Sequence, residues 1–385
     1  MNITHVFLSG PYNDGWSYHE NVLAKWHRKS GHNVSLITTP FVHGADAGSQ
    51  SYFKEGEYTD ENGVNVVRLS PPMGAAAKIL RKYNGLYEAL CEQKPDIIFL
   101  HCIQTAAVKD ITRYVRDNPG VTLYGDNHAD YTNSAQSFVS KNVLHKIVWK
   151  HYTKLLLPYV KKLYGVLPAR VDFLKKMYAV SPDKVELLFM GADDECVQRA
   201  LRSEMKDEIR TKFNIAEDDF FVVTGGKIDE YKQEILLLAD AVKNTDNDKV
   251  KLVIFGSIAK SLQAEFERRT NCERIFYAGW ITPEDAYCYF AAADLVVFPG
   301  RHSVFWEQAV GVGAPCVFKR WDGTTHVDLG GNCVFLEEAS EEELEKTLKD
   351  LCQNRGKLDA MRRVAKEKGI ESFSYSFLAA RAIGE

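Results

Sequence analysis

Short apolar runs recur along the whole chain, and stretches with the length and polarity of helices separate them. Most runs are apolar nearly throughout, which is typical of strands buried on both faces of a parallel sheet. The first series comprises residues 4–8, 34–37, 64–69, 96–100, 121–124, 165–167 and 185–189. A second series comprises residues 220–223, 250–255, 274–277, 295–298 and 315–318, with helices predicted over 231–242, 258–269, 283–292 and 305–311. This order predicts an α/β fold with two Rossmann-like, doubly wound parallel-sheet domains.

The length of the chain also favours two domains, because 385 residues exceed what a single hydrophobic core usually serves. We predict a first domain over residues 1–195 and a second over residues 196–370. The final segment, 371–385, is amphipathic and able to pack back on the first domain. Two such domains in series imply a central cleft.

Net charge and cysteine content indicate which partners and which cellular compartment to expect. A net charge of −4 gives no argument for a nucleic-acid partner. The eight cysteines are scattered without a CxxC pair, so reduced thiols are expected. The first apolar run is about as long as one strand, far short of the roughly 20 apolar residues of a membrane span. We therefore expect a cytoplasmic protein without nucleic acid as a partner.

A glycine turn with two lysines closes the first strand of the second series, in the string VVTGGKIDEYKQE. The strand ends at Gly225 and Gly226, and Lys227 and Lys232 follow. Ligands of open α/β sheets bind at the carboxyl ends of the strands, so both ammonium groups are placed where a phosphate would bind. The alternative is that Lys232 is a solvated helix-start residue paired with a neighbouring acid.

Glu307 stands in the first turn of the helix predicted over 305–311, just before the small-residue string GVGAP. As a ligand-binding residue it is expected to accept bonds from two ribose hydroxyls, whereas the alternative is a structural carboxylate favoured by the helix dipole. The small residues favour the first interpretation, because they let a ligand approach the backbone closely. Lysines and an acid at one sheet edge suit a ligand that carries both a diphosphate and a sugar diol, such as a nucleotide-sugar.

These motifs, together with the strand IFGS that contains Gly256, resemble the retaining family-four glycosyltransferases of the GT-B fold over nearly the whole chain. In that family a Gly-Arg-Leu turn and a following lysine bind the donor diphosphate. Lys227 stands at the arginine position and Lys232 at the lysine position. The resemblance implies that the second domain binds the nucleotide-sugar and that the first faces the acceptor.

One departure from the family pattern lies before Glu307. The family has a second glutamate eight positions earlier, near the donor sugar, and here that position is Pro299. The loop that follows has no acid and consists of Arg301, His302, Ser303 and Val304. Its backbone amides are expected to face the diphosphate or the sugar. The sequence names no residue for the missing carboxylate.

The first domain offers further candidates. The loop with Gly15, Trp16 and Ser17 resembles the family's N-terminal loop over donor and acceptor, although Gly15 can equally serve a turn and Trp16 a helix staple. In GDNHADY, the resemblance makes His128 the contact to the donor sugar, followed by the acidic Asp130. The alternative is a structural histidine, and His101 is a second candidate.

A basic segment from Lys141 to Lys176 contrasts with the acidic chain. Lys146, Lys150 and Lys154 follow one another at four-residue steps, with apolar residues on other faces, as in a basic amphipathic helix. Such a helix suits an anionic membrane surface on the cytoplasmic face, where lipid-linked acceptors reside. The alternative is a solvated helix face above a buried apolar side.

The resemblance implies a retaining, metal-independent transferase that moves a sugar from a nucleoside-diphosphate sugar to a glycan or lipid-linked acceptor. No His, Cys or carboxylate cluster has the spacing of a metal site, so no metal and no cofactor are expected. Two alternatives stay open: a non-catalytic nucleotide-sugar-binding protein and a sugar-nucleotide epimerase of the same fold. A dinucleotide oxidoreductase is disfavoured, because no GxGxxG follows a strand.

Overall fold

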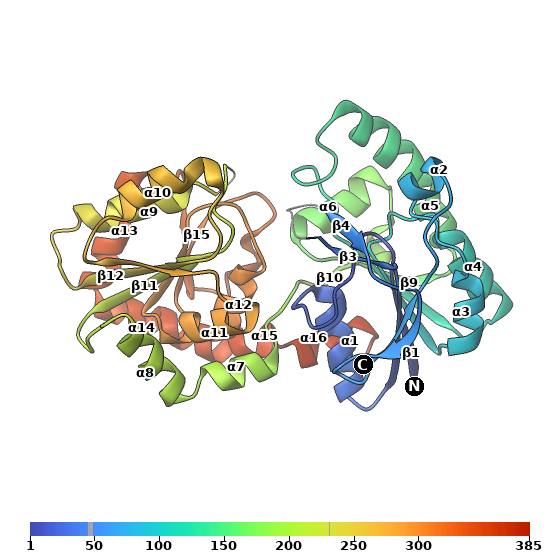
Figure 1. The fold of residues 1–385 in the computed structure, drawn as a ribbon, viewed down its shortest axis with the longest axis horizontal. Helices are drawn as coiled ribbons and strands as arrows, with labels where there is room; N and C mark the ends of the chain where they lie inside the picture. Colours follow the sequence, from blue (N-terminus) through green and yellow to red (C-terminus); the bar gives the residue numbers. More distant parts are fainter. Residues whose placement is uncertain (45–48, 231) are drawn as a thin grey trace. The chain divides into compact units, whose positions relative to one another are not determined.

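The computed structural model describes residues 1–44, 49–230 and 232–385 and divides into two units (Figure 1). Unit 1 consists of Met1–Phe189 with Leu378–Glu385, and unit 2 consists of Met190–Phe377. Each unit has its own sheet and its own buried core. The predicted α/β fold with two parallel-sheet units is confirmed.

The sheet of unit 1 is parallel except at one edge. From edge to edge it contains β10 (Val185–Leu187), β9 (Val160–Gly165), β8 (Thr122–Asn127), β7 (Ile97–His101), β1 (Asn2–Phe7), β2 (Asn33–Thr38), β6 (Asn65–Arg68) and β5 (Gly56–Thr59). Only β5 runs antiparallel to its neighbour. A separate hairpin is formed by β3 (Phe41–His43) and β4 (Gln50–Tyr52). The central strands carry the apolar runs that the sequence predicts, and every residue of β7 is buried.

Helices of unit 1 connect the strands. They are α1 (His19–Lys29), α2 (Ala75–Ile79), α3 (Leu86–Gln93), α4 (Val108–Asp117), the π-helical η1 (Ser140–Trp149), α5 (Lys150–Leu156), α6 (Pro168–Met177), the short η2 (Pro182–Lys184) and the C-terminal part of α16 (Tyr375–Ala382). The hydroxyl of Tyr124 donates to the carbonyl of Ile383 at 2.8 Å, which fastens the C-terminal residues to β8.

The strand predicted at 165–167 is wrong in its position, because β9 runs from Val160 to Gly165. Lys161 and Lys162 interrupt the apolar run and hide the strand from the pattern. The ammonium of Lys162 bonds the carbonyl of Asp183 at 2.9 Å outside the core. The basic segment 141–176 contains most of η1, all of α5 and β9, and most of α6. Lys146, Lys150 and Lys154 lie on η1 and α5, which follow one another directly, so the helix predicted there is confirmed.

The sheet of unit 2 is entirely parallel. Its order is β13 (Ile275–Gly279), β12 (Val250–Phe255), β11 (Phe220–Gly225), β14 (Leu295–Phe298), β15 (Cys316–Lys319) and β16 (Cys333–Leu336). Although β12 and β13 lie between them in sequence, β11 and β14 are neighbours in the sheet. The loops after both strands therefore open at one edge of the sheet.

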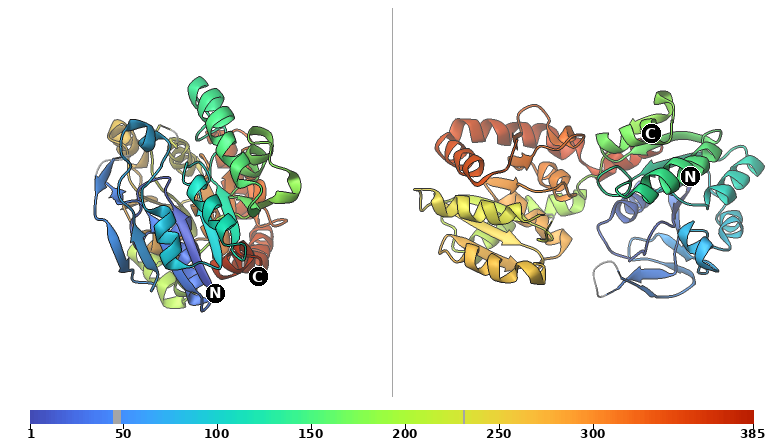
Figure 2. Two further views of the ribbon diagram at one scale, coloured as in Figure 1. Left: turned by 90° about the vertical axis from the view of Figure 1, so that its right-hand side faces the viewer. Right: turned by 90° about the horizontal axis from the view of Figure 1, so that it is seen from above.

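Helices cover both faces of this sheet (Figure 2). They are α7 (Asp194–Ala200), α8 (Ser203–Lys212), α9 (Glu234–Asn244), η3 (Lys260–Leu262), α10 (Gln263–Thr270), α11 (Pro283–Ala292), α12 (Phe305–Gly311), η4 (Thr325–Val327), α13 (Glu341–Gln353), α14 (Arg355–Val364), η5 (Ala365–Gly369) and α15 (Ile370–Ser372). The helices predicted over 283–292 and 305–311 have the predicted bounds. Residue 231, the predicted start of another helix, lies outside the described residues. None of the described helices combines the length and apolar composition that crossing a bilayer requires.

Candidate functional site

Two glycine turns meet at the carboxyl edge of the unit 2 sheet, after β11 and β12. Gly226 has φ +119° and Gly256 has φ +117°, a region that side chains rarely adopt. A Cβ on Gly256 would lie 1.9 Å from the carbonyl oxygen of Gly226, so no side chain fits between the turns. The two amides already donate within the edge, from Gly226 to Phe255 and from Gly256 to Gly279. These glycines therefore let the backbones approach, while charged contacts to a ligand have to come from neighbouring side chains.

The two lysines of the first turn have different surroundings. Lys227 is exposed, and its ammonium lies 3.2 Å from a carboxylate oxygen of Asp229. Lys232 is partly buried, and burial lowers the pKa of its ammonium, with Asp229 opposing and Lys227 adding to that effect. Asp229 thus pairs with Lys227 and also acts electrostatically on Lys232, so the alternative in which Lys232 is balanced by a neighbouring acid stays open. Both ammonium groups belong to the segment that connects β11 to α9.

Glu307 lies in the first turn of α12 and is fully buried. His302, from the preceding loop, and His326, from η4, each place Nε2 2.8 Å from the same carboxylate oxygen, Oε1. Burial alone raises the pKa of Glu307, but the two histidines outweigh burial and lower the pKa to about 2. The carboxylate is therefore anionic at neutral pH, and its Oε1 accepts two imidazole N–H bonds.

The second oxygen of Glu307, Oε2, is buried and has no hydrogen-bond partner among the residues that the structure describes. Leaving a buried charged acceptor unpaired costs about 1–3 kcal/mol or more. A hydroxyl donor from a ligand or from solvent would remove that cost. Because the side chain is fully covered, such a donor reaches Oε2 only when the covering side chains shift.

A second carboxylate, Glu234, lies beside the loop where the family's other glutamate is missing. A Cβ on Gly300 would lie 3.1 Å from Oε2 of Glu234 and 3.5 Å from Cα of Lys232. This Oε2 is also buried and without a hydrogen-bond partner in the described part of the chain. Glu234 was not among the residues predicted from the sequence, although its position two residues after Lys232 and at the start of α9 is a usable signal.

The other predicted loop residues have mixed environments. Arg301 is exposed, whereas Ser303 and Val304 are partly buried and supply the first carbonyl acceptors of α12. The GVGAP string packs closely: a Cβ on Gly311 would lie 2.4 Å from the Cβ of Ala192. The structure therefore uses these small residues for packing within unit 2.

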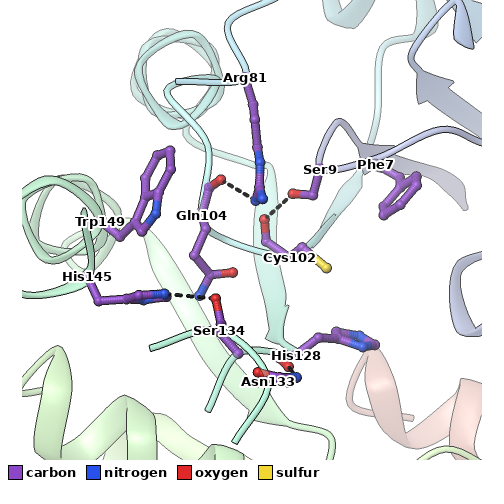
Figure 3. Close-up of a pocket in the computed structure, with 11 residues that line it drawn as sticks. Phe7, Ser9, Arg81, Cys102, Gln104, His128, Asn133, Ser134, His145 and Trp149 are labelled. Carbon is purple, nitrogen blue, oxygen red and sulfur yellow. Dashed lines mark hydrogen bonds between the residues drawn. The ribbon is translucent and has the colours of Figure 1, made fainter. Parts of the chain in front are cut away.

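In unit 1, His128 follows β8 directly and lies next to Asp126, the last but one residue of that strand. His128 Nε2 is 3.3 Å from Oδ1 of Asp126, and its side chain is 26 % exposed. With Asn133, His128 lines the lower edge of a cavity of about 280 Å³ (Figure 3). The cavity is also lined by Phe7, Ser9, Arg81, Cys102, Gln104, Ala129, Ser134, His145 and Trp149.

Asp130, in contrast, uses its carboxylate for hydrogen bonds within unit 1. Its Oδ1 accepts the N–H groups of Thr132 and Asn133 at 2.7 and 3.0 Å, and its Oδ2 lies 3.3 Å from Arg170. The predicted loop over the ligand is found before α1: Gly15 has φ +72°, Ser17 is partly buried, and the exposed Trp16 stacks on His43 at 4.7 Å. Trp16 and Gly15 therefore shape the loop surface of unit 1.

A chain of buried histidines runs from Asp126 to the C-terminal helix, and only its first member, His101, was a candidate from the sequence. His101 Nδ1 is 2.8 Å from Asp126 and its Nε2 is 2.9 Å from His5 Nδ1. His5 Nε2 is 2.9 Å from His27 Nδ1, and His27 Nε2 is 2.7 Å from the carbonyl of Ala379. A histidine inside an apolar strand, as in ITHVF, was the available signal.

The carbonyl of Ala379 fixes the direction of this chain, because a carbonyl only accepts. His27 must donate through Nε2, His5 must donate to His27, and His101 must donate to His5. Burial lowers the pKa of His5 and His27, so these two rings are neutral. Burial by itself raises the pKa of Asp126, but His128 and His101 outweigh burial and hold the pKa well below its usual range. The Nδ1 of His101 faces this carboxylate at 2.8 Å.

The two parallel-sheet units define the class of protein, a GT-B fold. Among solved structures, the chain is similar to a glycosyltransferase from Rickettsia africae (13% identity, TM-score 0.72, 98% of this chain and 96% of the other). It is also similar to the sucrose-phosphate synthase of Thermosynechococcus elongatus (13%, 0.69, 98% and 96%) and to Anabaena HepE in complex with UDP (13%, 0.69, 99% and 98%). These likenesses establish the fold.

The sequence of unit 2 resembles one glycosyltransferase family. Residues 219–354 match the model of the family Glycosyl transferases group 1. A comparison with curated protein sequences gives no match. The resemblance to GT-B glycosyltransferases is thus confirmed: the fold agrees over nearly the whole chain, and the family model matches the part of unit 2 that carries Lys227, Lys232 and Glu307.

Proposed function

We propose that the protein is a retaining glycosyltransferase that moves a sugar from a nucleoside-diphosphate sugar to a glycan or lipid-linked acceptor. One observation carries the proposal: the buried, anionic Glu307 keeps one oxygen, Oε2, without a hydrogen-bond partner among the described residues. The family match over residues 219–354 supports it. Anabaena HepE, which shares the fold, was solved with UDP-glucose bound.

The donor is recognised by two kinds of group. Oε2 of Glu307 accepts a ribose hydroxyl, since a charged acceptor strengthens such a bond. Lys227 and Lys232 bind the diphosphate, and the partly buried ammonium of Lys232 gains most when an anion joins it, because burial disfavours its charge. His128 is assigned to the donor sugar. Gly226 and Gly256 permit close approach of the backbone.

The transfer breaks the bond between the sugar's anomeric carbon and the leaving phosphate oxygen, and forms a bond to the acceptor oxygen on the same face. The acceptor proton passes to the leaving phosphate. Negative charge grows on the diphosphate during this step, and Lys227 and Lys232 stabilise it more in the transition state than in the ground state. The lysines supply the positive charge, so the proposed step requires no metal ion.

Glu234 is assigned the place of the carboxylate that the family has near the donor sugar. Its buried Oε2 lies beside Gly300, one residue after the position where the family pattern has an acid. Glu234→Gln is expected to lower the rate of transfer more than it weakens binding of the free nucleotide. Equal loss in both measurements would leave Glu234 with a packing role only.

The first experiment measures the thermal stability of the full chain with nucleoside diphosphates and their sugars, since a ligand of the folded state raises stability. We expect one nucleotide to stabilise the wild type and to stabilise Glu307→Gln less, when each is compared with its own ligand-free form. The matched control is Glu342→Gln, an exposed first-turn glutamate of α13. Equal stabilisation of Glu307→Gln and wild type would refute the ribose assignment.

Product analysis then separates the alternatives. Donor binding without hydrolysis or transfer over a broad acceptor panel would indicate a non-catalytic binding protein. An isomerised sugar nucleotide formed without acceptor would indicate an epimerase. An anomer of the product opposite to that of the donor would refute retention.

A surface of η1 and the residues before it supports docking on an anionic membrane, on the cytoplasmic face if the protein is cytoplasmic. Four apolar side chains are exposed there: Phe138 (78 %), Val139 (59 %), Val143 (42 %) and Ile147 (62 %). The exposed Lys141 and Lys146 alternate with them, and Lys150 and Lys154 continue the row on α5. Exposed apolar groups among lysines are typical of a helix that lies in a membrane interface.

Docking is tested with vesicles. We expect the wild type to sediment with vesicles rich in phosphatidylserine, and Phe138→Asp with Ile147→Asp to stay in solution. The matched control is Phe53→Asp, another exposed aromatic of unit 1. Binding that survives the double substitution would contradict this part of the proposal.

A further inference from the structure

A second group of ligand-type side chains lies in unit 1, and of its members only His128 is also assigned to the donor sugar. His19 at the start of α1, Asp126 in β8 and His128 just after β8 bring two imidazole nitrogens and a carboxylate within 4.8 Å of one another. His19 and Asp126 are buried, and His128 is partly exposed. Asp126 and His128 are close in sequence, but His19 is far from both, so no spacing motif in the sequence predicts this group.

The distances within this group differ from those of ordinary hydrogen bonds. His128 Nε2 is 3.3 Å from Oδ1 of Asp126, and His19 Nε2 is 3.7 Å from Oδ2. N–H···O bonds are usually about 2.7–3.2 Å long. Two ligand atoms on one tetrahedral Zn²⁺, each about 2.0–2.1 Å from the ion, lie about 3.3–3.4 Å apart. The 3.3 Å separation of His128 Nε2 and Oδ1 matches that of two ligands on one such ion, and the 3.7 Å separation of His19 Nε2 and Oδ2 is too long for a direct hydrogen bond.

The remaining contacts of Asp126 are those of a supported metal ligand. Its Oδ1 accepts the backbone N–H of Cys102 at 2.7 Å, and its Oδ2 bonds His101 at 2.8 Å. Behind His101, the hydrogen-bonded chain of His5 and His27 holds that ring in place. Hydrogen bonds behind a ligating carboxylate orient it and are a regular part of metal sites.

The other cluster of this composition in the described residues shows the contrast. In unit 2, His302 and His326 both bond Oε1 of Glu307 at 2.8 Å. Those distances are the lengths of direct N–H···O bonds, which need no ion between the atoms. The longer separations occur around Asp126 alone of these two clusters.

We propose that His19, Asp126 and His128 bind a divalent transition-metal ion of the size and ligand preference of Zn²⁺. Three protein ligands leave a fourth position, as in open zinc sites, and the partly exposed His128 places it toward the cavity of Figure 3. Water or an oxygen of a bound molecule would fill that position. Coordination through Nε2 leaves Nδ1 of His128 as a donor, so the contact assigned to it in sugar transfer is compatible with the ion.

The test uses the full chain without a histidine tag, stripped with a chelator and titrated with Co²⁺ and with Zn²⁺. We expect one equivalent of Co²⁺ to bind with the visible absorption of a four-coordinate ion, and Zn²⁺ to displace it. His128→Ala should weaken binding at least tenfold, because it removes a direct ligand. His151→Ala, an exposed histidine of α5, and His302→Ala, in the other cluster, are the matched controls and should bind as the wild type does.

A second measurement covers variants that fold poorly. Zn²⁺ should raise the melting temperature of the wild type and of His151→Ala, and should not raise that of His128→Ala. The proposal is overturned if no saturable binding occurs below millimolar metal, or if binding survives His128→Ala. Loss of binding in His302→Ala alone would also overturn it by locating the ion at Glu307. None of these readouts depends on transferase activity.

Discussion

Replacing Glu307 by glutamine isolates the contribution of one buried charge. Glutamine has nearly the same shape and keeps one oxygen that can accept from His302 and His326. It removes the negative charge that both imidazoles face at 2.8 Å, and places an NH₂ group where Oε2 lies. The substitution therefore resembles permanent protonation of the carboxyl.

The pKa of Glu307 gives the expected magnitude. A shift from 4.5 to about 2 favours the folded state with ionised Glu307 by about 3 kcal/mol, at about 1.4 kcal/mol for each pKa unit. Because the folded pKa is depressed, this stability is fully present above pH 4.5 and is lost as the pH falls toward 2. At pH 7 Glu307→Gln should lose about 3 kcal/mol, a decrease of about 6–12 °C in the melting temperature for a unit of this size.

Urea unfolding of wild type and Glu307→Gln at pH 7 and at pH 3 measures both quantities. We expect the difference in unfolding free energy to shrink from about 3 to about 1 kcal/mol, because at pH 3 the wild type has lost most of this contribution. Glu342→Gln should match the wild type at both pH values. A difference below about 1 kcal/mol at pH 7, or one that is unchanged at pH 3, would refute the electrostatic account of Glu307.

Two further predictions concern the other charged groups. Lys232→Ala should lower the turnover number at least tenfold without changing the fold. The control, Lys346→Ala on the exposed face of α13, should leave the turnover number unchanged. An equal rate for both variants in a purified assay would remove Lys232 from the mechanism. Burial lowers the pKa of His27 to about 4. Between about pH 6.5 and 4 the unfolded chain therefore binds a proton at His27 that the folded chain does not bind. The free energy of unfolding should fall by about 3 kcal/mol as the pH drops through that range. His27→Gln should lose this part of the dependence in urea unfolding between pH 7.5 and 4.5, and an unchanged slope would contradict it.

Parts of the candidate site follow from the chain alone. The GG turn after an apolar strand predicts close backbone approach, and Gly226 and Gly256 have the positive φ that such turns need. The position of Glu307 in the first turn of a helix follows from the apolar run 295–298 and the loop after it, since β14 and α12 are local elements. Patterns of this kind are readable because burial and helix periodicity act over a few neighbouring residues.

The sequence alone predicts two sheets of mainly parallel strands and the sheet edge at which Lys227, Lys232 and Glu307 are expected. Only the tertiary structure decided which side chains meet there: His326 joins His302 on Glu307, Glu234 lies beside Gly300, and Asp126 collects the histidines of unit 1. Strand order, helix packing and burial set these encounters, and they act between residues that are distant along the chain. A buried carboxylate needs donors from whatever element packs against it, and no local pattern records that partner.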